Sequence, residues 1–240
     1  MRVIVCENYE QLSKEGAKLF ASQMILKPTS VLGLATGSTP VGLYKHLIEM
    51  NKAGEIDFSD ITSFNLDEYY PLSPENDQSY RYFMNENLFN FVNIDKARTF
   101  VPNGLSENPE EEGKNYDELI EKAGGVDIQL LGIGQNGHIG FNEPDVNLIT
   151  GTHLTDLTEN TIQANSRFFN SIDEVPTKAI TMGMASIMKA KKIVLLASGA
   201  NKKAVVSELL NDHITTNVPA TLLKLHPDVV LICDKEAYGA

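Results

Sequence analysis

The chain is poor in basic residues. It has 20 lysines and arginines against 32 aspartates and glutamates, which gives a formal net charge of −12. A nucleic-acid-binding surface needs a clustered basic stripe, and the sequence contains none, so we expect no nucleic-acid partner. The acidic residues are spread along the chain. Their densest group, ENPEEE at 107–112, predicts the start of a helix after Pro109, because carboxylates favour helix N-termini.

Cysteines and long apolar runs are also scarce. Cys6 and Cys233 are the only two cysteines, and each lies in an apolar run that predicts a strand, where cysteine behaves as a small core residue. Their spacing gives no disulfide framework and no metal site, although a disulfide between the two stays open. No run approaches ~18 apolar residues, and the N-terminus lacks a long apolar signal region. We therefore expect a soluble, cytoplasmic protein with no membrane partner.

Short apolar runs alternate with helical patterns along the chain. With 240 residues, 42% of them hydrophobic, the chain can form one large α/β domain or two small ones. The alternation predicts an α/β fold with a doubly wound, mostly parallel sheet and helices on both faces. The predicted strands are Val31–Ala35, Ile61–Leu66, Asp127–Ile133, Ile193–Ala197 and Val229–Cys233, and the predicted helices are Tyr9–Leu26, Pro40–Lys52, Gln78–Leu88, Glu110–Lys122 and Asn201–Leu210.

Two features of this organisation bear on function. No linker divides the chain, so residues 1–240 are expected to form a single catalytic domain. The segment Asn147–Pro176 breaks the rhythm because it is polar and weakly periodic. It is either a flap over a site or an irregular insertion.

The loop Gly132–Pro144, GIGQNGHIGFNEP, carries three glycines at G-x-G-x-x-G spacing directly after a predicted buried strand. A dinucleotide site requires a helix after such glycines, but the following residues have no helical period and include a proline, so we reject that reading. His138 lies between Asn136 and Glu143. A lone histidine is often a buried structural residue, but this setting favours acid/base chemistry near neutral pH.

A second loop, Ala35–Pro40 with the sequence ATGSTP, leads from a predicted strand into a predicted helix. Free backbone N–H groups at a helix start suit a phosphate. It is not a P-loop, because the Gly-Lys-Ser/Thr ending is missing. Ser38 and Thr39 are therefore candidates for anion binding, with an ordinary helix cap as the equally common alternative.

A third strand end carries two adjacent carboxylates, Asp67 and Glu68, in the segment NLDEYY. A carboxylate there can act as a general base if it lies near a carbon acid, and a solvated turn is the alternative. The carboxyl ends of parallel strands meet at one edge of a sheet, so these loops are expected to converge.

Cations complete the set of candidate residues. Arg167 lies in NSRFF, and Lys202 and Lys203 follow SGAN at a predicted helix start. Cations oppose the dipole at a helix N-terminus, so an anionic ligand would explain them, whereas a solvated surface lysine is the common alternative.

Six motifs in order resemble the glucosamine-6-phosphate deaminase family, also called glucosamine-6-phosphate isomerase. They are LGLATGSTPVGLY (32–44), SFNLDEYYPL (63–72), GIGQNGHIGFNEP (132–144), ANSRFF (164–169), ASGANK (197–202) and LHPD (225–228). The resemblance implies a fold shared with sugar-phosphate isomerases and lactonases. It also implies a reaction in which D-glucosamine 6-phosphate and water give D-fructose 6-phosphate and ammonia, with no metal or organic cofactor.

The resemblance also implies roles for individual residues. Asp67 is the base that moves the C2 proton. His138 opens the sugar ring with Glu143 as its partner, and Asn136 fills the remaining catalytic position. The implied phosphate-binding residues are Ser38, Thr39, Arg167 and Lys202, with Lys203 as the alternative to its neighbour.

The chain departs from the family at two places. Several members have Asp where this chain has Asn136, so this residue is expected to orient the site rather than to charge it. Regulated members carry basic residues in the region matching Thr150–Thr155 and a longer C-terminus. Here that region reads TGTHLT and the sequence stops at Ala240, so we expect no activation by N-acetylglucosamine 6-phosphate.

Two other functions are weighed against this one. A 6-phosphogluconolactonase of the same fold would share the phosphate clamp but has no evident need for Asp67. A non-catalytic sugar-phosphate sensor would not need Asp67 and His138, and the sequence shows no helix-turn-helix segment. Residues 158–177 are a candidate lid that Arg167 would couple to phosphate binding. A homo-oligomer is a candidate assembly.

Overall fold

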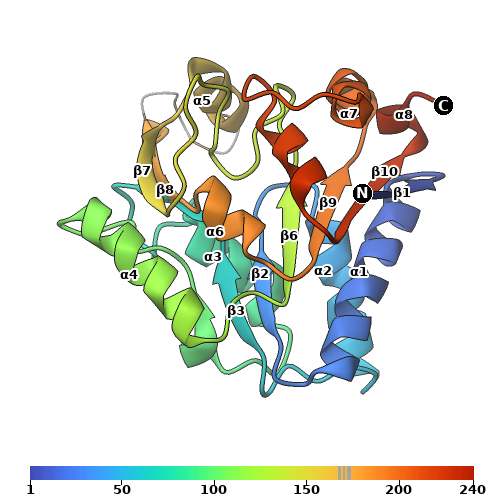
Figure 1. The fold of residues 1–240 in the computed structure, drawn as a ribbon. Helices are drawn as coiled ribbons and strands as arrows, with labels where there is room; N and C mark the ends of the chain where they lie inside the picture. The colour runs from blue at the N-terminus through green and yellow to red at the C-terminus, as the bar shows by residue number, and fades with distance from the viewer. Residues whose placement is uncertain (167–168, 170, 172–173) are drawn as a thin grey trace.

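A seven-stranded parallel sheet forms the centre of the molecule (Figure 1). The computed structural model describes residues 1–166, 169, 171 and 174–240, without the side chains of 160, 164 and 165. The strand order β1-β10-β9-β6-β2-β3-β5 confirms the predicted doubly wound α/β class. The strands are β1 (Arg2–Cys6), β2 (Val31–Leu34), β3 (Thr62–Asn65), β5 (Thr99–Phe100), β6 (Ile128–Gly132), β9 (Ile193–Ala197) and β10 (Val229–Asp234).

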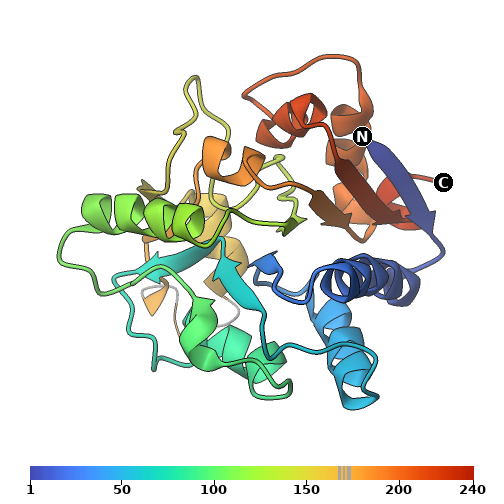
Figure 2. The ribbon, with the colours of Figure 1, turned by 60° about the horizontal axis from the view of Figure 1, so that its bottom comes forward.

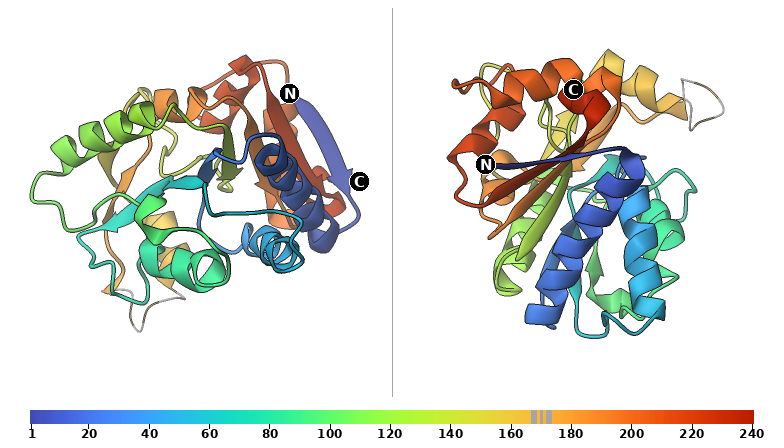
Figure 3. Two further views of the ribbon diagram at one scale, coloured as in Figure 1. Left: turned by 90° about the horizontal axis from the view of Figure 1, so that it is seen from below. Right: turned by 90° about the vertical axis from the view of Figure 1, so that its right-hand side faces the viewer.

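Helices cover both faces of this sheet (Figures 2 and 3). On one face lie α1 (Tyr9–Leu26) and α2 (Val41–Lys52), which pack closely because Gly16 has no side chain: a Cβ there would lie 2.7 Å from Leu43 of α2. On the other face lie α4 (Pro109–Lys122) and α6 (Met184–Met188). The remaining helices are α3 (Tyr80–Met84), α5 (Glu159–Asn165), α7 (Lys203–Leu210) and α8 (Lys235–Tyr238), with 3-10 turns at Lys96–Arg98, Ala200–Lys202 and Pro219–Leu225.

Local chemistry explains where the long helices begin. The side chain of Asn8 accepts a hydrogen bond from the Gln11 N–H at the start of α1. Asn108 caps α4 in the same way, and Pro109 stands in the first turn, where its missing N–H is harmless. The acidic residues 110–112 occupy that first turn, as the sequence predicted.

A second, three-stranded antiparallel sheet was not predicted. Its order is β4-β8-β7, with β4 (Asp67–Tyr70), β8 (Lys178–Thr181) and β7 (His153–Asp156). The interpretation of 67–70 as a loop is wrong. The Leu66 N–H bonds the Leu34 carbonyl of the main sheet, and the Leu66 carbonyl accepts from Met182 N–H beside β8. The chain therefore passes from one sheet into the other without a turn.

Other predictions need correction. The segment Asn147–Pro176 contains β7 and α5 among its described residues, so it is not an irregular insertion throughout. The helix expected over Gln78–Leu88 is α3 followed by a π-helical turn at Asn85–Phe89, and Ser79 caps α3. Cys6 and Cys233 are both buried and free. Within the described parts of the chain, no helix is long and apolar enough to cross a membrane.

Candidate active site

Strand β6 ends at Gly132, and the glycine-rich loop that follows contains turns rather than a helix. The helix that a dinucleotide-binding fingerprint requires after its glycines does not follow here. The glycines allow close contacts: a Cβ on Gly134 would lie 2.4 Å from Cε1 of His138, and one on Gly137, where φ is +86°, would lie 2.4 Å from Val218. The loop therefore folds its own backbone under the imidazole of His138.

His138, Glu143 and Asn136 come together as the sequence predicted. Nδ1 of His138 lies 3.2 Å from Oε1 of Glu143, an ion-pair separation without the alignment of a hydrogen bond. Asn136 donates from Nδ2 to Oε2 of Glu143 at 2.6 Å, and its Oδ1 accepts from the His138 N–H at 3.3 Å. The His138 side chain is 24% exposed and that of Glu143 11%, so the imidazole still reaches solvent. Asn136 therefore orients both partners while carrying no charge.

Glu143 is held as an anion. Burial raises the pKa of its carboxyl, but the neighbouring imidazole of His138 and the donors Asn136 and Thr161 outweigh burial and lower the pKa to about 2. A carboxylate that stays ionised can fix the tautomer of a neighbouring histidine and stabilise its protonated form. The arrangement is therefore suited to proton transfer by His138.

Asp67 lies at the start of β4 and is only 6% exposed. Burial raises the pKa of its carboxyl to about 8, and the charge of Glu68 acts in the same direction. Its Oδ2 lies 3.7 Å from the position that a Cβ on Gly140 would occupy, so the carboxylate faces the loop that carries His138. A carboxylate with a pKa near neutrality beside an acid/base histidine provides two separate proton-transfer groups.

The carboxylate of Glu68 contacts the start of α3 rather than the glycine-rich loop that Asp67 faces. Its Oε1 accepts from the N–H groups of Tyr69 at 2.9 Å and Tyr80 at 2.8 Å, and its Oε2 accepts from Arg81 N–H at 2.9 Å. Burial nevertheless raises the pKa of its carboxyl to about 7, against these three N–H donors. Glu68 thus ties β4 to the start of α3. Of the two adjacent carboxylates, Asp67 is the one that faces the loop of His138.

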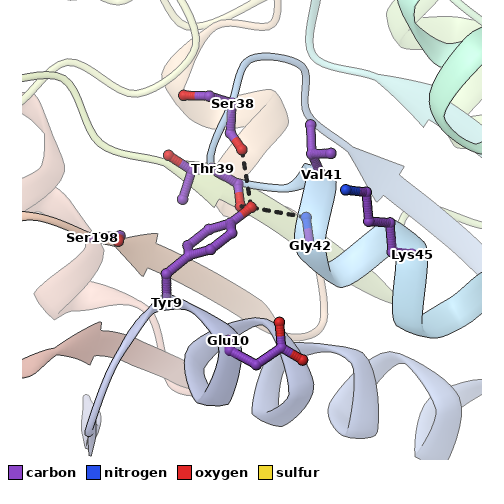
Figure 4. Close-up of a pocket in the computed structure, with 8 residues that line it drawn as sticks. All are labelled: Tyr9, Glu10, Ser38, Thr39, Val41, Gly42, Lys45 and Ser198. Atoms are coloured by element: carbon purple, nitrogen blue, oxygen red, sulfur yellow. Dashed lines mark hydrogen bonds between the residues drawn. The ribbon is translucent and has the colours of Figure 1, made fainter.

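The candidate phosphate-binding residues Ser38 and Thr39 lie in the loop after β2. Together with Ser198 they line a pocket of about 480 Å³ (Figure 4). The Tyr9 hydroxyl lies 3.1 Å from the Ser38 carbonyl and 3.0 Å from that of Thr39, and it accepts from Gly42 N–H at 2.8 Å. Tyr9 therefore holds the loop of Ser38 and Thr39 in position, and nothing in the sequence around Tyr9 predicts this role. The pocket joins the ends of β2 and β9, which carry Ser38 and Ser198.

The two adjacent lysines point in different directions. Nζ of Lys202 donates to the Ile133 carbonyl at 2.7 Å, inside the glycine-rich loop, and burial lowers the pKa of Lys202. The side chain of Lys203 lies against Gly239, where a Cβ would be 2.5 Å from its Cε. Lys202 is thus the lysine beside the glycine-rich loop. Arg167, the other predicted cation, lies outside the described residues.

Two contacts near the candidate catalytic residues have no counterpart in the sequence predictions. Thr161 of α5 donates to Glu143, and Oγ1 of Thr181 on β8 accepts from Phe141 N–H at 3.0 Å. Both are single threonines outside any motif, so only the folded geometry identifies them. Among the described residues, no group of three or more His, Cys, Asp or Glu side chains is placed to hold a metal ion.

Known proteins share the sequence and the fold of this chain. The family model of glucosamine-6-phosphate isomerases and 6-phosphogluconolactonases matches residues 8–231. The glucosamine-6-phosphate deaminase of Thermoanaerobacter pseudethanolicus is 62% identical over 99% of this chain and 94% of its own length. That of Clostridium perfringens is also 62% identical, over 99% of this chain and 98% of its own length.

Solved structures agree with these relatives. A monomeric glucosamine-6-phosphate deaminase superposes with a TM-score of 0.97 at 45% identity, covering 100% of this chain and 99% of that one. The 6-phosphogluconolactonase from Trypanosoma cruzi superposes with a TM-score of 0.79 at 19% identity, covering 99% and 96% of the two chains. At that identity the second likeness shows a shared fold alone.

Proposed function

The chain belongs to the family of glucosamine-6-phosphate isomerases and 6-phosphogluconolactonases, and on that premise we propose that it is a glucosamine-6-phosphate deaminase. The enzyme converts D-glucosamine 6-phosphate and water into D-fructose 6-phosphate and ammonia. The reaction needs three tasks: opening the pyranose ring, moving a proton from C2 to C1, and replacing the amine by water. The first two tasks need separate acid/base groups, because they act on different atoms of the sugar.

Ring opening falls to His138. A proton must leave the anomeric hydroxyl and another must reach the ring oxygen, and an imidazole can do both near neutral pH. Glu143, 3.2 Å from Nδ1, stabilises the protonated imidazole, and Asn136 holds Glu143 from its other oxygen. The ring nitrogen that is not occupied by Glu143 is then free to face the sugar.

Proton transfer from C2 falls to Asp67. In the open-chain sugar the C2 proton lies next to the aldehyde, which makes it acidic enough for a carboxylate base. Burial raises the pKa of Asp67 to about 8, and a base works best when its pKa lies near the working pH. The substrate carries an ammonium group at C2, and an adjacent positive charge favours the ionised carboxylate. The same carboxyl then returns this proton to C1, while the C2 ammonium loses one proton and the former aldehyde oxygen gains one, so that C1 becomes an alcohol and C2 an iminium. Water then adds to C2 and the C2–N bond breaks, which gives the ketose and ammonia.

The phosphate is held at the opposite end of the sugar by Ser38, Thr39, Lys202 and Arg167. The first two stand just before α2, where the positive end of the helix dipole favours an anion. Nζ of Lys202 reaches the Ile133 carbonyl, so the cation stands beside the catalytic loop. Holding the sugar at one end lowers the entropic barrier at the other, an effect that reaches roughly 7–11 kcal/mol in well-oriented reactions.

One observation supports this proposal above the others: the carboxylate of Asp67 is buried and faces the loop that carries the His138–Glu143 pair. The test is a coupled assay that measures fructose 6-phosphate and ammonia from glucosamine 6-phosphate. Hydrolysis of 6-phosphogluconolactone is measured beside it, because the family includes lactonases. Lactone hydrolysis without ammonia release would contradict the proposal.

Three further properties belong to the proposal. Residues 1–240 act as one catalytic domain, because the proposed site residues that the structure describes come from strand ends and adjoining segments of the same fold. A phosphorylated sugar is retained within cells, which fits a cytoplasmic enzyme. The candidate homo-oligomer is tested by size-exclusion chromatography with light scattering, against the solved relative with a TM-score of 0.97, which is monomeric.

A further inference from the structure

Thr161, the third residue of α5, contacts the catalytic glutamate directly. Its Oγ1 donates to Oε1 of Glu143 at 2.8 Å, and Thr161 is only 9% exposed. Thr158, which caps α5, places its Oγ1 3.0 Å from Oγ1 of Thr161 and 3.5 Å from the same Glu143 oxygen. A segment of the chain outside every catalytic motif therefore reaches the acid/base pair.

The direction of these hydrogen bonds is fixed by chemistry. An ionised carboxylate only accepts, so the Thr161 hydroxyl must donate to Glu143, and its lone pair is then left to accept from Thr158. Oε2 of Glu143 is taken by Asn136 at 2.6 Å, and Oε1 is shared between Thr161 and His138. Donors on both oxygens fix the plane of the carboxylate relative to the imidazole.

The hydroxyl of Thr161 is not needed to start the helix. Thr158 already caps α5, because its side chain accepts from the Thr161 N–H. Threonine is a poor helix former compared with alanine, because its branched side chain loses freedom in a helix. Its hydroxyl donates to Glu143 and accepts from Thr158. The choice of threonine at this position is therefore explained by its hydrogen bond to Glu143 rather than by helix formation.

We propose that Thr161 is a positioning residue for ring opening, whose hydroxyl holds Glu143 in the orientation that His138 requires. The inference rests on the proposed deaminase function and deepens it. Because Thr161 acts through Glu143, it affects the rate of the chemical step. It does not affect the affinity for the phosphate end of the sugar.

The test replaces Thr161 by valine, which keeps the shape and removes the donor. We expect kcat for glucosamine 6-phosphate to fall by about 10-fold or more, because a hydrogen bond to a charged group is lost. KM should stay within about 3-fold, and so should the inhibition constant of D-glucitol 6-phosphate, an open-chain probe that needs no ring opening. Thr161→Ser should restore kcat to near the wild-type value.

The matched control is Thr155→Val. Thr155 lies on β7, and its hydroxyl makes only a long 3.4 Å contact with the Asp156 carbonyl. It should keep wild-type kcat and KM. If Thr161→Val fails to fold, Thr161→Ala replaces it, because alanine is the best helix former. Wild-type kcat in the folded valine or alanine variant would overturn the proposal. So would a parallel rise in KM and in the glucitol 6-phosphate constant, or a serine variant no better than valine.

A double-mutant cycle tests the route through Glu143. In a Glu143→Gln background, Thr161→Val should lower kcat by less than about 2-fold, because the group it positions is already lost. An equal loss in both backgrounds would overturn the proposal. Failure of the wild-type enzyme to release ammonia would instead contradict the proposed function, before any variant is compared.

Discussion

Asp67 is a buried carboxylate whose environment favours the neutral form. Its replacement by asparagine removes the base while keeping the shape, so we expect Asp67→Asn to lose at least about 1,000-fold in kcat, in line with the loss of a general base. Binding of glucitol 6-phosphate should change little, because the phosphate clamp is intact. Deamination at near-normal rate by this variant would show that the base is elsewhere.

The same substitution should raise stability. The folded-state pKa of Asp67 is raised from 3.8 to about 8. Its contribution to the free energy of unfolding is therefore complete below about pH 4 and is lost as the pH rises towards 8. A neutral asparagine side chain has no such loss, so the Asp67→Asn variant should be more stable than the wild type at pH 7 by on the order of 4 kcal/mol. Thermal melts at pH 4 and pH 7 check this, because the difference should vanish at the lower pH.

Glu68 should tune the pH dependence of Asp67. Burial is the larger cause of the raised pKa of the Asp67 carboxyl, and the charge of Glu68 is the second cause. Glu68→Gln removes that charge, so the acid limb of the kcat/KM profile should move to lower pH by up to about one unit, since neighbouring carboxylates titrate as a coupled pair. Glu55→Gln, at an exposed glutamate, is the matched control. An unmoved acid limb in the Glu68 variant would count against the coupling.

Lys202 and Lys203 offer a comparison between adjacent residues. Lys202 reaches the catalytic loop through the Ile133 carbonyl, whereas Lys203 lies against Gly239. We expect Lys202→Ala to raise KM and the inhibition constant of inorganic phosphate by about 10- to 100-fold, as for a lost charged hydrogen bond. Lys203→Ala should leave both within about 2-fold. Equal effects of the two substitutions would contradict the assignment.

At the scale of elements, the glycine-rich loop acts as the support of His138. A Cβ on Gly134 would meet the imidazole at 2.4 Å, whereas one on Gly132 would meet nothing within 4 Å. Gly134→Ala should therefore displace His138 and lower kcat by about 100-fold, the loss expected from a misplacement of about 1 Å. Gly132→Ala should keep wild-type kcat. Steady-state kinetics of both variants decide the matter, and equal activity would show that the loop adapts.

The elements that the sequence predicted well are those with local signals. The strand predicted over Ile193–Ala197 has those same bounds in the structure, and Tyr9–Leu26 is helical throughout. The strand is a continuous buried apolar run, and the helix has a helical apolar period whose buried face packs against its neighbours. By contrast, β4 is polar and pairs with β8, far along the chain, so no local pattern predicted it. Strand pairing of this kind depends on the tertiary fold.

The candidate site shows the same division. His138, Glu143 and Lys202 were predicted because they stand in motifs at strand ends, and the structure gathers them around one loop. Tyr9 and Thr161 were not predicted. Their relevance depends on which acceptor a hydroxyl meets after folding, and that acceptor lies in another element. A sequence motif therefore identifies the reactive residues more easily than it identifies the residues that hold them in position.

At the scale of the whole molecule, two apolar clusters flank the site. The large one fills the space between the main sheet and its helices. The small one contains Tyr69, Phe141, Leu157 and Ala179. These residues come from β4, the glycine-rich loop, the chain before α5, and β8, so the small cluster packs the segments of Asp67, His138 and Thr161 together. A change in any of these segments is expected to reach the others through this packing.

The surface around Thr150–Thr155 bears on regulation of the whole enzyme. Both oxygens of the Asp117 carboxylate face this region: Thr152 donates to them from N at 2.8 Å and from Oγ1 at 2.6 Å, and Ser186 donates from Oγ at 2.8 Å. His153 supplies the only basic side chain of the segment, and its Nδ1 lies 2.9 Å from the Gly151 carbonyl. A carboxylate here disfavours a phosphorylated effector, since like charges repel.

We therefore expect hyperbolic kinetics for glucosamine 6-phosphate, with kcat and the shape of the curve unchanged by N-acetylglucosamine 6-phosphate. Activation requires an effector to bind one state of the protein more tightly than another, and the segment Thr150–Thr155 itself offers a phosphate no cation beyond His153. Initial rates over a range of substrate concentrations, with and without the effector, check the expectation. A rise in KM alone would reflect competition for the active site and agrees with it. A sigmoidal curve that becomes hyperbolic on adding the effector would contradict it, because such a change requires a second site coupled to the first.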